Sequence, residues 1–459
     1  MEGNIAEYLA SYADSLNYED IPLEVVYRTK VLLIDTLACG IGGYSSEPAQ
    51  IARRIAGRVS PVHMPATVLG SGQKSSPELA TFANGVMTRY LDFNDAYFSK
   101  EGGHPSDNFA PILTCADAVH VGGKQVLVAS VLAYEVFCRL CDHIVISPQG
   151  FDHATMGLIS AVMGVSKILG LSREQMVQAI NIAVVSSIAL GQTRVGEVSM
   201  WKACALANAG RNAVFAALLA KEGMTGPGPV FEGHNGFFKA LSGPFQFDEF
   251  GGQGRGFRIM DAMIKRYPCG TFGQTAVDAA LLVRSQISSV EDIVKINVGT
   301  LAFGKRAMAS DAEKWHPKTR ESADHSIPYA VGVSLMHGPL EIKHFSDPYL
   351  HDPVLHDLIQ RIVVEETEEC NSLYPGANAT RVEVITRTGE KVSELVRYHR
   401  GHPLNPLTKD EIEHKFHSLA RDLLPPGKSK ELLSLIWNIE RVNDAGRIME
   451  LLTKESIRA

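Results

Sequence analysis

The first half of the chain is dominated by long apolar segments with helical spacing, and this pattern limits the possible folds most strongly. Ser76 and Pro77 are typical of a helix start, and Leu79, Phe82 and Val86 then repeat at intervals of three and four residues on one face. Three further helices are predicted over residues 155–170, 173–190 and 200–223. Such helices, joined by short glycine-containing links, favour a large all-α bundle over alternating strands and helices.

Small side chains in the last of these segments predict closely packed helices. They are Ala203, Ala205, Ala207, Ala209 and Gly210. The distance between two packed helices depends on the size of the side chains at their contact. We therefore expect this helix to approach its neighbours closely.

The pattern changes in the second half, where strands are expected beside helices. Half-buried strands are predicted over residues 293–298 and 381–386, and helices over 274–287 and 325–336. From Thr408 onward the spacing is helical again. We expect a mostly α protein with an α+β part. The large all-α domain would comprise residues 1–263 and 401–459, and a smaller α+β lid domain residues 264–400.

Composition and charge exclude several classes of protein. The 459 residues are 45% hydrophobic and 21% charged, with a formal net charge of −7, which argues against a nucleic-acid partner. The seven cysteines are scattered and odd in number, unlike a secreted disulfide framework. Residues 1–4 do not form a basic leader, and no membrane span is expected. We expect a soluble cytoplasmic protein.

A polar cluster follows the first predicted helix. Asp92 and Asp95 precede a Gly-Gly turn and His104-Pro105. A carboxylate beside an imidazole fixes its tautomer and shifts its pKa, as general acid/base catalysis requires. Alternatively, the aspartates cap backbone amides and His104 is a turn residue; the spacing alone does not separate the two interpretations.

Three other polar residues stand among apolar neighbours. Lys202 would seek an anion if it is desolvated, or would otherwise extend to solvent. His153 opens a helix, where it is either a cap or a functional group. Tyr329 is either a core tyrosine with a satisfied hydroxyl or a proton donor. No zinc or iron–sulfur ligand spacing is present, and the glycine-rich segments do not fit a nucleotide-binding motif, so we expect neither metal nor cofactor.

Taken together, these segments resemble the MmgE/PrpD family almost from end to end. The matching motifs occur in order at residues 31–40, 92–95, 103–108, 201–202, 265–268, 274–277, 324–325 with Tyr329, 401–408 and 415–416. The string GHPSDN at 103–108 is closer to the 2-methylcitrate dehydratase branch. The chain departs from the family where decarboxylase members carry a histidine, because Cys269-Gly270 stands there, and near Phe272, where dehydratase members carry one.

The resemblance implies a homodimer with a helical domain, an α+β lid and a cleft between them. In that cleft it places Asp92, His104, His153, Lys202 and Tyr329 as catalytic residues. We expect a cofactor-free hydro-lyase acting on a small anionic di- or tricarboxylate such as 2-methylcitrate. His104 would be the acid or base, oriented by Asp92, and His153 or Tyr329 would protonate the leaving hydroxyl. The expected carboxylate ligands are Lys202, Lys265, Arg266 and Ser106.

Two alternatives remain open. Decarboxylation of a cis-aconitate-like acid, or epimerisation, would use the same carbanion chemistry. A non-catalytic binding protein on the same fold would not need His104, Lys202 and Tyr329 to converge.

Overall fold

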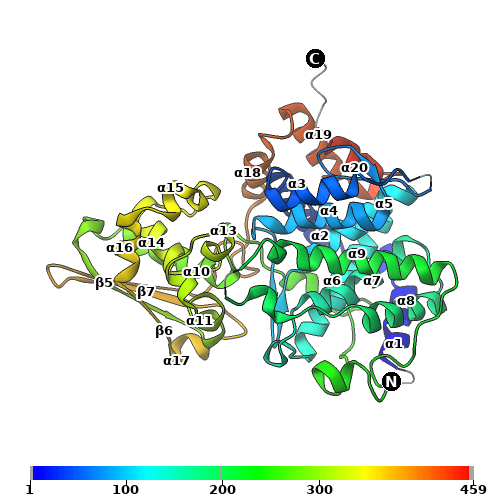
Figure 1. Cartoon of the computed structure of the whole chain (residues 1–459), viewed down its shortest axis with the longest axis horizontal. Coiled ribbons are helices and arrows are strands. Elements are labelled where there is room, and N and C mark those ends of the chain that lie inside the picture. Colours follow the sequence, from blue (N-terminus) through cyan, green and yellow to red (C-terminus); the bar gives the residue numbers. More distant parts are fainter. Residues whose placement is uncertain (1–3, 62, 197, 454–459) are drawn as a thin grey trace.

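Two main hydrophobic cores divide the molecule into a larger and a smaller body (Figure 1). The computed structural model describes residues 4–61, 63–196 and 198–453. Met1, Glu2 and Gly3, part of the segment in which no leader is expected, lie outside these ranges. The mostly α architecture with an α+β part, predicted from the sequence, is confirmed.

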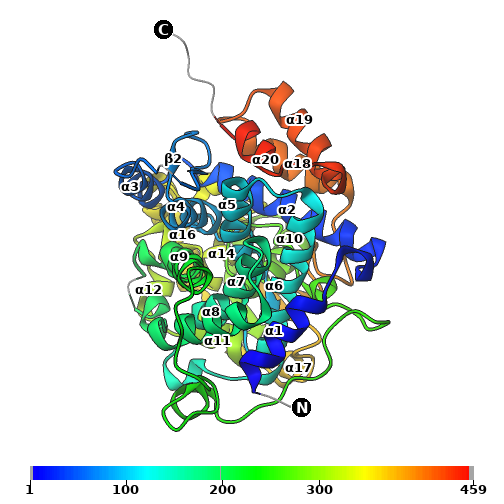
Figure 2. The same ribbon diagram turned by 90° about the vertical axis from the view of Figure 1, so that its right-hand side faces the viewer.

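The larger body is helical and includes both ends of the described chain (Figure 2). Its N-terminal helices are α1 (Ile5–Ser15), α2 (Leu23–Gly42), α3 (Glu47–Ala56), α4 (Pro77–Tyr90), α5 (Phe109–Val119), α6 (Gly123–His143), α7 (Ala154–Ile168), α8 (Arg173–Ser186) and α9 (Trp201–Lys221). Its C-terminal helices are α18 (Lys409–Ala420), α19 (Pro426–Trp437) and α20 (Gly446–Leu451). Two short hairpins, β1 (Ala66–Thr67) with β2 (Lys74–Ser75) and β3 (Tyr97–Phe98) with β4 (Gly102–Gly103), complete it.

Helix boundaries follow the predicted signals closely, with one difference. α4 begins at Pro77 after Ser76, as the sequence indicates. α8 begins after Ser172, whose hydroxyl accepts a hydrogen bond from the Gln175 N–H, but it ends at Ser186 rather than at Leu190. The backbone is extended at Ser187, and Leu190 instead forms a bridge with Phe151. The residues after α8 are thereby free to line a cavity.

α9 packs tightly against α4, as its small residues predict. A Cβ added to Gly85 on α4 would lie 2.8 Å from the Ala207 Cβ and 2.9 Å from the Ala207 Cα. Among the described residues, α9 is the one helix long and apolar enough to cross a membrane, and 67% of its apolar window is buried inside the protein.

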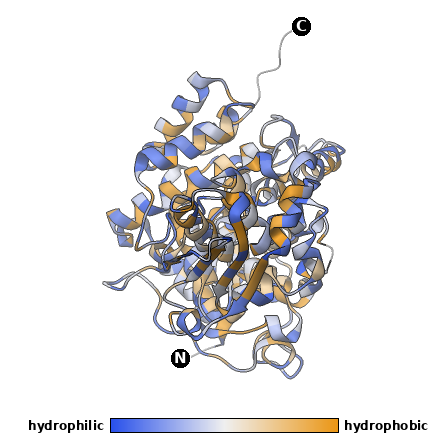
Figure 3. Ribbon diagram, turned by 90° about the vertical axis from the view of Figure 1, so that its left-hand side faces the viewer, coloured by the Kyte–Doolittle hydropathy of each residue, from blue (hydrophilic) through white to orange (hydrophobic). Residues whose placement is uncertain are grey.

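The smaller body is built on a four-stranded sheet. The strands are β5 (Ile293–Thr300), β6 (Ile362–Glu366), β7 (Thr380–Thr386) and β8 (Lys391–Val396), in the order β6-β5-β7-β8, with only β5 and β6 parallel. Figure 3 shows hydrophobic residues along these strands. The helices are α10 (Thr271–Arg284), α11 (Ala302–Met308), α12 (Ala312–Trp315), α13 (Arg320–Ala323), α14 (Ile327–His337), α15 (Asp347–Leu350), α16 (Pro353–Gln360) and α17 (Glu368–Asn371). α10 packs on β7 and β8, and α14 packs against α10.

A lysine of the C-terminal segment connects three parts of the larger body. Lys415, on α18, lies 2.6 Å from Asp35 Oδ1 on α2. Its ammonium also donates hydrogen bonds to the backbone carbonyls of Phe93 (2.8 Å) and Lys265 (2.9 Å). The last helices therefore hold the segment that follows α4.

Candidate active site

A cavity of about 680 Å³ is lined by residues of both bodies. The larger body contributes residues from the segments 92–104, 147–153 and 190–195, together with Lys265. The smaller body contributes residues 270–272, part of 303–311, and His325. Four of the predicted site residues line this cavity: Asp92, His104, His153 and Lys265.

The turn after α4 brings Asp92 and His104 to the same place. Asp92 adopts the left-handed conformation (φ 50°), which aspartate tolerates better than most residues, and this turn ends the helix. The β3–β4 hairpin then reverses the chain and returns it to His104. The expected Gly-Gly turn is wrong in detail: the chain reverses at residues 99–101, and Gly102 and Gly103 form strand β4.

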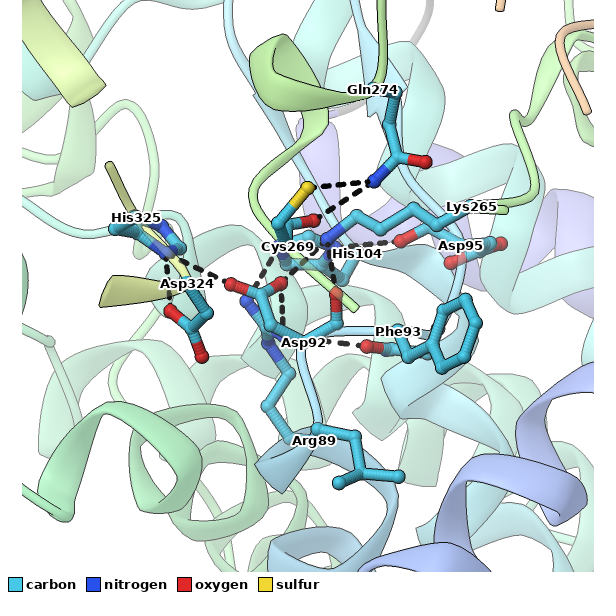
Figure 4. A network of polar contacts seen from close by, with 12 residues as sticks. Arg89, Asp92, Phe93, Asp95, His104, Lys265, Cys269, Gln274, Asp324 and His325 are labelled. Carbon is cyan, nitrogen blue, oxygen red and sulfur yellow. Dashed lines mark hydrogen bonds and ion pairs between the residues drawn. The ribbon is translucent and has the colours of Figure 1, made fainter. Parts of the chain in front are cut away.

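Asp92 is the centre of a buried cluster of charges (Figure 4). Its Oδ1 lies 2.7 Å from an Arg89 nitrogen and 2.5 Å from Lys265 Nζ. Its Oδ2 lies 3.0 Å from Lys202 Nζ and 3.0 Å from His325 Nδ1. Burial opposes ionisation of Asp92, but Arg89, Lys202 and Lys265 outweigh it and hold the pKa well below its ordinary value.

Asp324 is the second carboxylate of the cluster. It pairs with Lys202, and its Oδ1 lies 3.0 Å from His325 Nδ1. Burial acts to raise the pKa of Asp324, but Lys202 and His325 lower it overall. The anion predicted for Lys202 is therefore supplied by the protein itself, as Asp92 and Asp324. Lys202 does not extend to solvent, since only 4% of its surface is exposed.

His104 is held by Arg89 and not by Asp92 directly. Its Nε2 accepts a hydrogen bond from the Arg89 guanidinium (2.8 Å), and its Nδ1–H donates to the Asp95 carbonyl oxygen (2.6 Å). Both contacts require a neutral ring with the proton on Nδ1. Burial and the charges of Arg89 and Lys265 lower the pKa of His104 well below its ordinary value. Arg89 thus connects His104 to Asp92.

His153 lies beside His104 and, like it, is held by an arginine side chain. The two imidazole rings lie 5.5 Å apart, centre to centre. His153 Nε2 accepts a hydrogen bond from Arg194 (3.1 Å), which also binds both oxygens of Asp152. Burial and Arg194 lower the pKa of His153 to about 3. His153 does not cap α7; the Asp152 side chain accepts the Ala154 N–H instead.

Four predicted site residues do not line this cavity: Lys202, described above, and Tyr329, Arg266 and Ser106. Tyr329 is fully buried within the smaller body, and its hydroxyl donates to the His344 carbonyl. Arg266 is exposed and lines a separate hollow beside Lys415. Ser106 is buried, and its hydroxyl accepts a hydrogen bond from Asn94 (2.9 Å).

Four residues of the arrangement were not predicted from the sequence: Arg89, Arg194, Asp324 and His325. Arg89 stands three residues before Asp92, a spacing that places two side chains on one helix face and could have indicated the pair. Asp324-His325 is one of the segments that resemble the family, but the sequence gives it no role. Arg194 lies between two of the predicted helices, in a segment where no motif was expected.

The same cluster does not fit a metal ion. Asp92, Asp324 and His325 each offer a ligand atom within 4.8 Å of the others. The ammonium of Lys202 contacts both carboxylates, and Lys265 and Arg89 also contact Asp92. A divalent cation would have to displace these charges, so we assign no metal site here.

The cavity also has an aromatic wall. Phe98, Phe272 and Phe303 line it, and their ring centres lie 4.9 to 6.0 Å apart. Gly270 lines the cavity beside them. Gly270 and Phe272 lie where this chain departs from the family's histidine pattern, so both departures fall at this wall.

Comparison with known proteins identifies the family. Residues 7–249 match the MmgE/PrpD N-terminal domain, and residues 267–441 match the MmgE/PrpD C-terminal domain. A 2-methylcitrate dehydratase from Cupriavidus necator is 30% identical over 462 residues, which cover 93% of this chain and 93% of the relative. A mitochondrial 2-methylcitrate dehydratase from Yarrowia lipolytica is 27% identical, covering 94% and 87%. An alkylcitrate dehydratase from a fungal species is also 27% identical, covering 91% and 86%. The chain therefore belongs to the MmgE/PrpD family.

Proposed function

We propose that this protein is a cofactor-free hydro-lyase that dehydrates a small di- or tricarboxylate, with 2-methylcitrate as the first substrate to test. The observation that carries the proposal is the cavity, in which the cations Lys265 and Arg194 lie beside three imidazoles. Relatives at about 30% identity that carry the name 2-methylcitrate dehydratase support the same reaction class.

The reaction requires charge stabilisation that this cavity can provide. A base removes a proton α to a carboxylate, the β-hydroxyl leaves, and negative charge develops on the carboxylate oxygens. Lys265 and Arg194 would bind the carboxylates and stabilise that charge. A carboxylate that takes over the Arg194 guanidinium would free His153 Nε2 to face the substrate. Lys202 would not bind the substrate itself; it would hold Asp92 and Asp324 in place.

The aromatic wall suits an apolar substituent on the acid. Phe98, Phe272 and Phe303 offer no partner to a carboxylate, whereas a methyl or longer alkyl group would bury apolar surface there. The fungal relative is named an alkylcitrate dehydratase, which is compatible with such a substituent.

Three residues that the resemblance implies for the site do not fit this geometry. Tyr329, Arg266 and Ser106 have no part in the proposed reaction, because none lines the cavity. Decarboxylation and epimerisation need the same cations and remain the alternative reactions. Convergence of His104 and Lys202 on one ion network beside the cavity favours an enzyme over a non-catalytic binding protein.

We further propose a cytoplasmic homodimer with no nucleic-acid or membrane partner. Four large apolar side chains, two of which (Leu190 and Val195) line the cavity, are exposed and would be covered by a second subunit. They are Val185, Leu190, Val195 and Phe215, each more than half exposed.

The proposal is tested with 2-methylcitrate stereoisomers and related acids, following alkene absorbance, solvent-deuterium uptake and CO₂ release. Alkene formation without CO₂ is the expected result. CO₂ release would instead identify a decarboxylase, and deuterium uptake without alkene an epimerase. Arg194→Gln should raise KM about 10-fold or more, as loss of a charged hydrogen bond predicts. Arg447→Gln, at an exposed ion pair outside the cavity, is the matched control.

A further inference from the structure

We infer that His325 is the general base that removes the α proton of the substrate. This inference rests on the proposed proton-abstraction chemistry and goes beyond it by naming the group that carries it out. The geometry that points to His325 is a fixed Nδ1 on one side of the ring and an unoccupied Nε2 on the other.

Two carboxylates fix the His325 ring. Nδ1 lies 3.0 Å from Asp92 Oδ2 and 3.0 Å from Asp324 Oδ1. Both carboxylates are held ionised by Lys202 and its neighbours, so they accept a proton from Nδ1 rather than offer one. The neutral ring therefore carries its hydrogen on Nδ1, and the Nε2 lone pair is the basic site. The same carboxylates would stabilise the imidazolium once Nε2 has gained a proton.

Nε2 is free and accessible to a substrate. Among the residues that the structure describes, none makes a hydrogen bond or ion pair with His325 Nε2. The side chain is 16% exposed, and the residue lines the cavity with Lys265. A bound acid can therefore reach this nitrogen.

The other two histidines of the cavity differ at that atom. His104 Nε2 already accepts a hydrogen bond from Arg89 at 2.8 Å, and His153 Nε2 accepts one from Arg194 at 3.1 Å. Each of these lone pairs is occupied by a guanidinium, which only donates. His325 alone among the three presents an unoccupied basic nitrogen. His104 is then a positioning residue for Arg89.

Two groups on the cavity wall provide the proton acceptor and the proton donor that the elimination needs. The proton passes from the substrate Cα to His325 Nε2, and the C–H electron pair is first held by the adjacent carboxylate as an enediolate. That pair then forms the C=C bond as the Cβ–O bond breaks. The leaving hydroxide takes a proton from the ammonium of Lys265, which also lines the cavity, and departs as water. His325 and Lys265 return to their starting states by proton exchange with solvent.

His325→Asn tests this assignment, because the asparagine amide can occupy the place of Nδ1 while no atom replaces Nε2. We first measure wild-type turnover and the exchange of the α hydrogen in D₂O, using whichever acid the wild type consumes. In His325→Asn, we expect kcat and exchange to fall at least about 100-fold, as loss of a general base predicts, with KM within about twofold. His120→Asn is the matched control, since His120 Nδ1 also contacts an aspartate (Asp444, 2.9 Å) but lies outside the cavity.

His104→Gln separates the two histidines. It should retain α-hydrogen exchange well above that of His325→Asn. The inference is overturned if His325→Asn exchanges within tenfold of wild type, or if His104→Gln loses exchange while His325→Asn keeps it. Should His325→Asn not fold, His325→Gln is judged by the same limits. A wild type that neither exchanges nor dehydrates any acid would instead count against the proposed function.

Discussion

At the level of single residues, each buried charge in the cluster depends on a specific neighbour. Lys202 shows this most clearly, because its ammonium is the contact shared by Asp92 and Asp324. Removing one partner of a buried ion pair leaves the other partner's charge buried and uncompensated, which is much more costly than losing an exposed pair.

Lys202→Met should therefore lower the free energy of unfolding by about 3–5 kcal/mol, as well as reduce activity. The sequence predicts that a desolvated Lys202 seeks an anion, which a bound ligand could supply. Because two internal carboxylates supply it instead, the loss should fall on folding as well as on binding. Urea titration followed by circular dichroism measures the change. Lys343→Met is the control, because its pair with Glu341 (3.0 Å) is more than half exposed and should contribute less than about 1 kcal/mol. Equal losses in the two variants would contradict the prediction.

The sequence indicated some of these residues and not their partners. Asp92, His104 and Lys202 stood out because they are polar residues in apolar or turn segments. The contact from Asp92 to His325 joins residues more than 200 positions apart, which no local spacing reveals. The short separation of Asp92 and His104 suggested direct contact, but Arg89 lies between them, and its side chain comes from the helix that precedes both.

At the level of elements, the α4–α9 contact is the one in which side-chain size matters most. The run of small residues in α9 predicted close packing, and Gly85 on α4 provides the matching gap. Strands β5 and β7 were predicted from their apolar alternation, whereas β6 and β8 were not. β6 ends in Glu365 and Glu366, and β8 contains Lys391 and Glu394, so only their pairing with β5 and β7 makes them strands.

Gly85→Ala should destabilise the protein by about 1–3 kcal/mol, because the added methyl would overlap Ala207 and push the two helices apart. Thermal or urea unfolding gives the measurement. Gly427→Ala is the matched control: it lies in α19, and a Cβ there meets nothing within 4 Å. That change should be neutral or slightly stabilising, by less than about 1 kcal/mol. A neutral Gly85→Ala would mean that α4 and α9 can separate without cost.

At the level of the whole molecule, buried neutral histidines govern how stability responds to acid. Burial lowers the pKa of His153 and His399 to about 3, and that of His344 and His402 to about 4. In the unfolded chain these rings titrate near ~6.5. Below that pH the unfolded chain binds protons that the folded chain does not, so the free energy of unfolding decreases as pH falls.

Two buried carboxyls act in the opposite direction. Burial raises the pKa of Asp95 to about 6 and that of Asp107 to about 7, so the folded chain keeps protons that the unfolded chain loses above ~4. The four histidines, with His104 adding to them, outweigh the two carboxyls, and we expect a net loss of at least about 2 kcal/mol between pH ~6.5 and ~5. Urea unfolding at constant ionic strength measures it. His399→Gln should make the pH dependence of the free energy of unfolding shallower. A wild-type free energy of unfolding that does not change between pH ~6.5 and ~5 would contradict the prediction.

The position of Lys415 has a consequence for the order in which the protein is made. Its ammonium holds the backbone at Phe93 and Lys265, yet it is synthesised after every residue that lines the cavity. A nascent chain that ends before α18 contains every residue that lines the cavity but lacks the contact that fixes the loop of Asp92. Catalytic competence would thus arise only after α18 has been made and has docked, later than the synthesis of the cavity itself.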